Sequence, residues 1–180
     1  MFEILYRITD KTKDVYNLAE NPNDSGDIEG FFAINVNGEH YGHYHDNPLG
    51  DDESGWYLIT GWFINLLLAY KRLCESDYVA VNDIESFNSW IEFKKENGLI
   101  SVSLIKAKKP AGTAELQLTP FNEFSYGEWY QESVNLDEIH IELFNKATLY
   151  IEEIRKINAK LLVNAHIAQL EALVLQLQKK

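Results

Sequence analysis

Hydrophobic residues are most concentrated in residues 55–73, GWYLITGWFINLLLAYKRL, the most apolar run in the first two thirds of the chain. Between Trp56 and Tyr70 only a threonine, a glycine and an asparagine interrupt it. The run lacks the alternation of a half-exposed strand, and its leucine-rich second half favours a helix. A helix of about fifteen residues rises only about 22 Å, which is short of a bilayer core. We predict a central helix that packs on more than one side.

Charged residues of opposite sign lie at the two ends of this run. Asp51, Asp52 and Glu53 come just before it, whereas Lys71 and Arg72 lie at its end. Acidic residues near the start of a helix and basic residues near its end interact favourably with the helix dipole. The two charged groups therefore support a helix over this run.

Alternation of apolar and polar residues marks a first hairpin in residues 31–44. An Asn-Gly pair at positions 37 and 38 supplies the positive φ angles that a two-residue type I′ turn needs. This turn places Ile34 opposite Tyr41 and Phe32 opposite His43. We therefore predict an antiparallel pair of strands with a defined register.

A second hairpin is predicted in residues 90–106, again with an Asn-Gly turn, at positions 97 and 98. Its register places Ile91 opposite Leu104 and Phe93 opposite Val102 on one face. The other face carries the polar side chains of Glu92, Lys94, Ser101 and Ser103. We expect the apolar face to be buried and the polar face to be mostly exposed to solvent.

From Leu136 onward the apolar residues recur at helical spacing. The apolar stripe drifts near Asn158 and Asn164, which predicts a bend or break there. The segment 136–180 is too apolar at its end to stay unpacked. It either packs on the rest of the domain or pairs with another chain as an amphipathic helix, which would make the protein a homodimer.

Shorter strands are expected at residues 2–9, 78–81 and 114–119, and an irregular one at 124–134. Together the elements predict a single α+β domain over residues 1–180. An antiparallel β-sheet of about six or seven strands packs against the central apolar helix and the long C-terminal helices in this fold.

The chain has 180 residues, a formal net charge of −12 and a pI near 4.8. Nucleic acids and anionic membranes require a positive protein surface, so we expect neither as a partner. A basic protein partner is compatible with the charge. The single cysteine, Cys74, allows no intrachain disulfide, and the N-terminus does not resemble a secretory signal, so a cytoplasmic location is expected.

One stretch, EHYGHYHD at residues 39–46, combines residue types that bind metals. His43 and His45 are two positions apart and share a face of a strand, and with Asp46 they could hold zinc or iron. No second ligand motif follows, and the signatures of nucleotide-binding loops, serine hydrolases and Cys-x-x-Cys sites are absent. We therefore expect no catalytic residue and no cofactor, with a metal-dependent enzyme built on this hairpin as an alternative.

Three further stretches are FFAINVNGEHYG, GWFINLLLAYKRL and YVAVNDIESFNSWIEFKK, followed by Trp129 and by the acidic start of a helix at Leu136. These phrases and their order, over residues 31–154, resemble small bacterial immunity proteins of polymorphic and contact-dependent toxin systems. The resemblance implies a cytoplasmic, non-enzymatic α+β protein that neutralises a cognate toxin by binding it. Many such toxins are basic nucleases, for which an acidic inhibitor provides complementary charge.

Acidic loops beside the rigid hairpins, at residues 24–29 and 46–53, are the expected contact surfaces. Exposed tyrosine and tryptophan side chains at such edges often dominate the binding energy. The predicted protein-binding residues are Tyr41, Tyr44, Asp46, Asp51, Asp52, Glu53 and Trp56. The sequence thus favours an inhibitor of a basic toxin, with an assembly subunit acting through the C-terminal helix as a further alternative.

Overall fold

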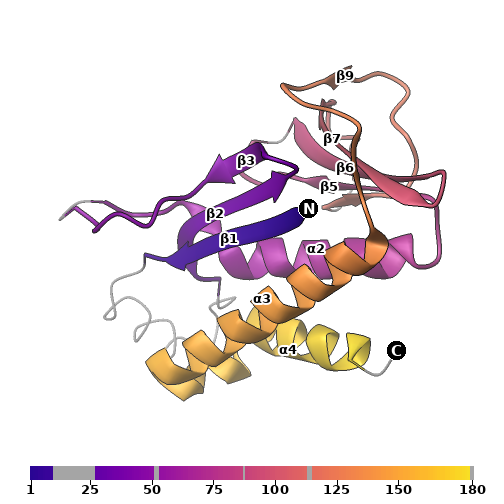
Figure 1. Cartoon of the computed structure of the whole chain (residues 1–180). Coiled ribbons are helices and arrows are strands. Elements are labelled where there is room, and N and C mark those ends of the chain that lie inside the picture. Colours follow the sequence, from indigo (N-terminus) through magenta and orange to yellow (C-terminus); the bar gives the residue numbers. More distant parts are fainter. Residues whose placement is uncertain (10–26, 51–52, 87, 113–114, 179–180) are drawn as a thin grey trace.

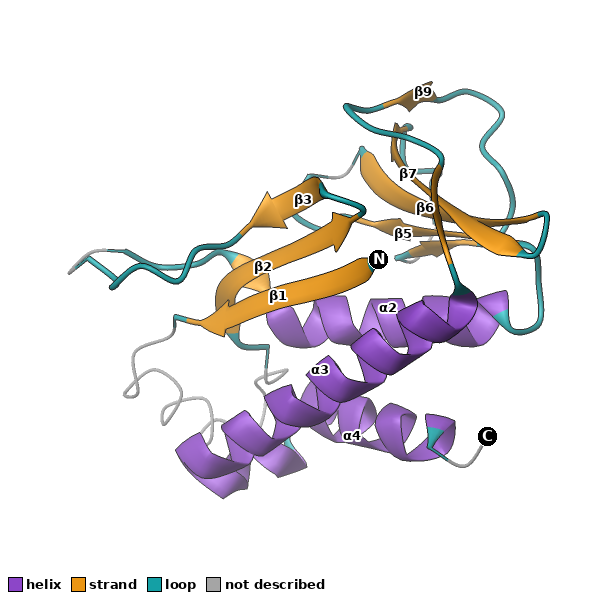
Figure 2. Ribbon diagram, viewed as in Figure 1, coloured by secondary structure: helices purple, strands orange, loops and turns teal. Residues whose placement is uncertain are grey.

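The computed structural model describes residues 1–9, 27–50, 53–86, 88–112 and 115–178 of the chain. Within these ranges the strands form two antiparallel sheets, and three α-helices lie below both sheets in the view of Figure 1. The predicted α+β class is therefore confirmed (Figure 2). Within the described residues, the strands are divided between two sheets instead of being joined in one, since no strand of one sheet pairs with a strand of the other.

The first sheet contains β1 (Phe2–Ile8), β2 (Glu29–Val36), β3 (Glu39–His43) and β4 (Tyr57–Leu58). Strand β2 lies between β1 and β3, and its first residues also pair with β4. Strands β2 and β3 form the predicted hairpin, with Ile34 opposite Tyr41. Asn37 and Gly38 have φ angles of 55° and 99°, the left-handed values of a type I′ turn.

The second sheet contains β5 (Tyr78–Asn82), β6 (Ser89–Glu96), β7 (Leu99–Lys106), β8 (Leu116–Gln117), β9 (Ser125–Tyr126) and β10 (Glu132–Val134). Its strand order is β10-β7-β6-β5-β8, and β9 also pairs with β7. Strands β6 and β7 form the second predicted hairpin, with Ile91 opposite Leu104 and Phe93 opposite Val102. These four side chains are buried in the main core.

Helix α2 (Ile59–Leu73) is the predicted central helix, and it begins later than the apolar run. Tyr57 and Leu58 pair with β2 as a short strand instead, because their backbone completes the edge of the first sheet. The first turn of α2 consequently contains no acidic residue. Asp51 and Asp52 lie outside the described residues, whereas Lys71 and Arg72 occupy the last turn as predicted.

The C-terminal segment forms α3 (Leu136–Asn158), the 3₁₀ helix η1 (Ala159–Val163) and α4 (Ala165–Leu177). The break falls where the drift of the apolar stripe predicts it. Asn158 has extended backbone angles, and its side chain accepts a hydrogen bond from the Lys160 backbone N–H. Five apolar side chains of α4 are buried in the main core, so in this chain the segment packs on the domain.

The core is centred on α2, which has the strands of both sheets on one side and α3 and α4 on the other (Figure 1). Trp62 and Phe63 of α2 pack against Phe32 of β2 at centroid distances of 5.2 and 5.6 Å. Thr60 and Tyr150 join α2 to α3 through a buried hydrogen bond of 2.8 Å between their hydroxyl oxygens. Among the described helices, none combines the length and hydrophobicity needed to cross a membrane.

Candidate functional site

The outer face of the second sheet, turned away from α2, differs from the expectation of an exposed polar surface. Of the four polar side chains predicted to be exposed, only Lys94 is exposed. Glu92, Ser101 and Ser103 are buried. The cause is a distant segment: residues 120–131, between β8 and β10, extend side chains over this face. The prediction of a mostly wet face is therefore wrong, because the hairpin pattern contains no information about this cover.

Part of the covered face is a second, smaller core. Trp90 of β6 is fully buried between strands β5 and β7, and its ring lies 4.9 Å from that of Phe121. The Trp90 indole N–H donates to the backbone carbonyl of Ala107 at 3.0 Å, so its polar atom is satisfied. This small core holds the start of the covering segment against the sheet.

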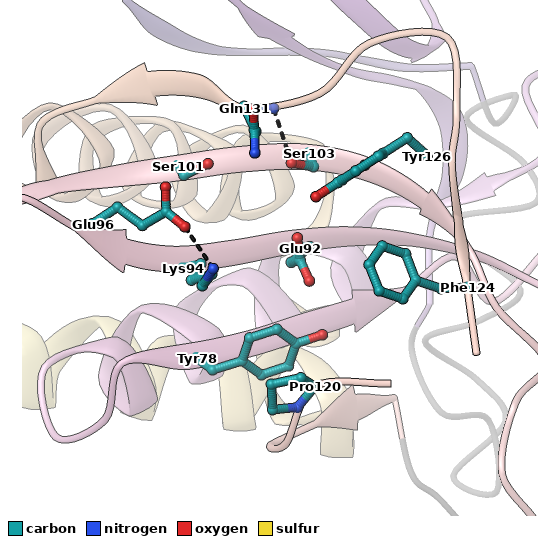
Figure 3. A pocket seen from close by; sticks show the side chains of 10 residues that line it. All are labelled: Tyr78, Glu92, Lys94, Glu96, Ser101, Ser103, Pro120, Phe124, Tyr126 and Gln131. Carbon is teal, nitrogen blue, oxygen red and sulfur yellow. Dashed lines mark hydrogen bonds and ion pairs between the residues drawn. The ribbon is translucent and has the colours of Figure 1, made fainter. Parts of the chain in front are cut away.

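Beside the small core lies a pocket of about 170 Å³. Figure 3 shows the Glu92 carboxylate near its centre, between the rings of Tyr78 on β5 and Tyr126 on β9. Ser103 forms part of the wall next to Glu92, and its hydroxyl oxygen accepts a hydrogen bond of 2.9 Å from the backbone N–H of Gln131. Gln131 has a φ of 58°, a left-handed conformation that turns its backbone N–H toward the sheet.

The charges in the pocket are unequally paired. Lys94 Nζ lies 2.5 Å from Glu96 Oε1 at the exposed end of the pocket. Glu92 is only 8% exposed, and burial raises the pKa of its carboxyl, an effect that the Tyr78 hydroxyl and the Lys94 charge partly offset. The Tyr78 hydroxyl is buried and completes no hydrogen bond of good geometry. Burial, and then the nearby Glu92 charge, raise the pKa of this hydroxyl. The interior thus contains hydrogen-bonding atoms that are removed from water and incompletely satisfied.

The rim of the pocket is aromatic and exposed. Phe124, Tyr126 and Tyr130 are 44%, 42% and 54% exposed. Their rings form a continuous group, with centroid distances of 5.4 Å between Phe124 and Tyr126 and 4.7 Å between Tyr126 and Tyr130. Tyrosine is enriched among the residues that dominate binding energy at protein interfaces, so these exposed rings are candidate anchors for a protein partner.

The predicted contact residues at β3 and in the loop after it are dispersed. The Tyr41 hydroxyl points inward and donates to Asp83 of the second sheet, so it is not a surface anchor. Trp56 is 55% exposed and stacks on the His43 ring, with centroids 5.6 Å apart. Asp46 is exposed, Tyr44 is half-buried, and Asp51 and Asp52 lie outside the described residues, as do residues 24–26 of the loop at 24–29.

The histidine hairpin is a packing cluster in this structure. The rings of His43 and His45 are 5.7 Å apart, and both contact the buried ring of Phe31. His45 Nε2 lies 2.6 Å from Glu53 Oε1, and the pKa of Glu53 is held below its usual value, first by the Gly50 backbone N–H and then by His45. Over the described ranges, no three His, Cys, Asp or Glu side chains converge to hold a metal ion, so the metal alternative gains no support.

A second group of acids connects the two sheets. Asp83, at the end of β5, accepts hydrogen bonds from the Tyr41 hydroxyl and from the Glu85 backbone N–H. Glu85 Oε1 in turn accepts a hydrogen bond of 3.1 Å from the Leu58 backbone N–H of β4. Burial, and then the neighbouring Asp83 carboxyl, raises the pKa of Glu85 to about 7. This arrangement suits a structural link, since it is filled by protein groups from both sheets.

The chain was compared with protein-family models, with curated proteins and with solved structures. No protein-family model matches the chain, and searches of curated proteins and of solved structures found no match either.

The pocket was not among the sites predicted from sequence. The available signal was the density of aromatic residues in 121–130, FNEFSYGEWY, which is high for a segment with no apolar periodicity. That signal does not indicate where the segment lies. Only its pairing with β7, at Ile105 opposite Tyr126, brings the aromatic residues next to Glu92.

Proposed function

We propose that the protein is a non-enzymatic binding protein for a basic protein partner, and that this partner is a cognate toxin which it inhibits. The observation that carries the proposal is the pocket on the second sheet, which combines a buried carboxylate with an exposed aromatic rim. Aromatic anchors around a desolvated centre are typical of protein-binding hot spots.

The charge of the chain supports the same partner. A net charge of −12 raises the rate at which a positively charged protein is encountered and disfavours acidic competitors. The resemblance of residues 31–154 to bacterial immunity proteins supports the toxin as the class of partner. The lining of the pocket contains neither histidine nor cysteine, and we assign its Glu92, Tyr78 and Lys94 side chains to recognition.

The test has two stages. The full-length protein is immobilised and used to capture proteins from a lysate of its source cells at low salt, and retained proteins are released by raising the salt concentration. A partner held by complementary charge is released more readily at high salt. The retained protein is then expressed alone and together with this chain, and cell growth is measured. We expect growth arrest with the partner alone and recovery when both are expressed.

Two results would contradict the proposal. One is capture of no basic protein under low-salt conditions. The other is a captured protein whose effect on growth is unchanged by equimolar amounts of this chain. Adding the chain in increasing amounts to the captured partner would also reveal a catalytic role. Inhibition by binding is complete only at one-to-one stoichiometry, whereas an enzyme would inactivate the partner at lower amounts.

A further inference from the structure

The size of the pocket limits what it can accept. At about 170 Å³ it is smaller than the roughly 300–1,000 Å³ that sites for whole small molecules and cofactors occupy. Figure 3 shows the Glu92 carboxylate between the side chains of Lys94 and Phe124. These dimensions suit one long side chain that enters end-on from another protein.

The interior specifies the chemistry of that side chain. Its buried polar residues are Glu92 and Tyr78, which are 8% and 7% exposed, together with Ser101 and Ser103, which are 6% and 1% exposed. The Tyr78 hydroxyl completes no hydrogen bond of good geometry, and the cost of burying the ionised Glu92 is offset only in part by the Tyr78 hydroxyl and the Lys94 charge. A cationic group with several N–H donors would satisfy both.

The lysine already in the site does not fill this role. Lys94 is exposed and its ammonium is paired with Glu96 at 2.5 Å, on the outer side of the pocket. One of the two lining carboxylates is thus matched by a cation of the same chain. Glu92 is the carboxylate that a partner's cation can approach.

The walls favour arginine over lysine. A guanidinium group is flat, stacks on aromatic rings and presents five N–H donors in a fixed plane, whereas an ammonium is a compact point charge. The rings of Phe124 and Tyr126 offer flat faces at the entrance. Beyond them, the Glu92 carboxylate and the Ser101 and Ser103 hydroxyls offer several acceptors instead of one.

We propose that this pocket receives a single arginine side chain of the basic partner, with its guanidinium between the Tyr126 ring and the Glu92 carboxylate. The inference rests on the proposed function, which it deepens by naming the group that is recognised. It also predicts that the pocket binds a short peptide with a single arginine, which can be measured without the partner.

The first experiment titrates the isotope-labelled full-length protein with three short peptides that differ only at one central residue: arginine, lysine or citrulline. Citrulline keeps the shape of arginine and removes the charge. We expect the arginine peptide to shift the amide resonances of Glu92, Ser103 and Gln131, and to bind at least about tenfold more tightly than the other two peptides.

Paired variants localise the effect. Glu92→Gln should reduce arginine-peptide binding about tenfold or more, whereas Glu128→Gln, which removes an exposed charge from the covering segment outside the pocket, should leave it unchanged. Tyr126→Leu should abolish the preference for arginine over lysine while leaving weak binding of both. Unchanged dispersion of the amide spectrum shows that each variant is folded.

The outcomes separate this inference from the proposed function. If a captured partner binds the wild-type chain and Glu92→Gln equally well, the inhibitor function stands and the arginine pocket is wrong. If the arginine peptide binds in the pocket but no basic partner is captured, the pocket stands and the proposed function fails. Equal binding of the arginine and citrulline peptides, or peptide-induced shifts confined to other surfaces, would overturn the pocket.

Discussion

The two hairpins, β2–β3 and β6–β7, have the same turn chemistry but different outer surfaces. Each turns at an Asn-Gly pair with left-handed φ angles, and each has the register that this turn imposes. On the first, the rings of His43 and His45 contact Phe31, and Trp56 stacks on His43. On the second, residues 120–131 form a pocket over Glu92. A turn therefore determines which residues are opposite one another, while distant segments determine what covers them.

The hairpins also differ in regularity. Gly42 of β3 has a φ of 97°, and the ring of His43 consequently lies on Phe31, although its backbone is opposite Phe32. No residue of β6 or β7 has a positive φ, and the alternation of faces is kept throughout. The irregular strand belongs to the hairpin with the histidine cluster, whereas the regular hairpin supports the candidate site.

The largest effect on this comparison is expected from Gly42→Ala. A Cβ atom at this position would lie 2.2 Å from the Phe32 carbonyl oxygen, in addition to the strain of a left-handed alanine. We expect a loss of about 3 kcal/mol in the free energy of unfolding, measured by chemical denaturation. Gly98→Ala is the matched control, because its φ is 82° and a Cβ there meets no atom within 4 Å. It should cost only about 1 kcal/mol, and equal losses would contradict the packing argument.

A second prediction concerns the acids that connect the hairpins. The pKa of Glu85 is raised from the ordinary value of 4.5 to about 7 in the folded state. Between these two pH values the folded state keeps a proton on Glu85 that the unfolded state has released. Stability should therefore fall as the pH rises from about 4.5 to about 7, by about 2 kcal/mol for this half-buried group. Above pH 7 the loss is complete.

Glu85→Gln should remove this dependence and be more stable than the wild-type chain at pH 8, because the amide keeps an oxygen acceptor for the Leu58 N–H without a charge. The measurement is denaturant unfolding at a series of pH values. Glu128→Gln, an exposed change of the same charge, controls for the net charge of the chain. Parallel pH profiles for wild type and Glu85→Gln would refute the role given to this carboxyl.

The smallest effect is expected from Trp56→Ala. Its ring is 55% exposed and its stacking partner, His43, is exposed as well. We expect a loss of about 0.5–1 kcal/mol in the free energy of unfolding. A loss above about 2 kcal/mol would mean that Trp56 is needed to hold His43 against Phe31, and the two outer surfaces would then be equally structural.

Sequence patterns were sufficient for the local elements. Asn-Gly turns and alternation predicted the register of both hairpins. The leucine-rich apolar run predicted α2, and helical periodicity predicted α3 and the break near Asn158. These features depend on interactions within about ten neighbouring residues, which a linear pattern records. The beginning of α2 was missed because Tyr57 and Leu58 pair with β2, a contact with residues far away in the chain.

What the sequence determined by itself is the class, the registers and the charge: an α+β chain with two Asn-Gly hairpins and a net charge of −12. The tertiary structure alone decided that Tyr41 turns inward to Asp83 and that Glu92 is buried beneath Tyr126. The physical reason is that burial depends on which surfaces meet. A glutamate in an alternating strand has the same sequence signature whether water or a segment from 30 residues further along covers it.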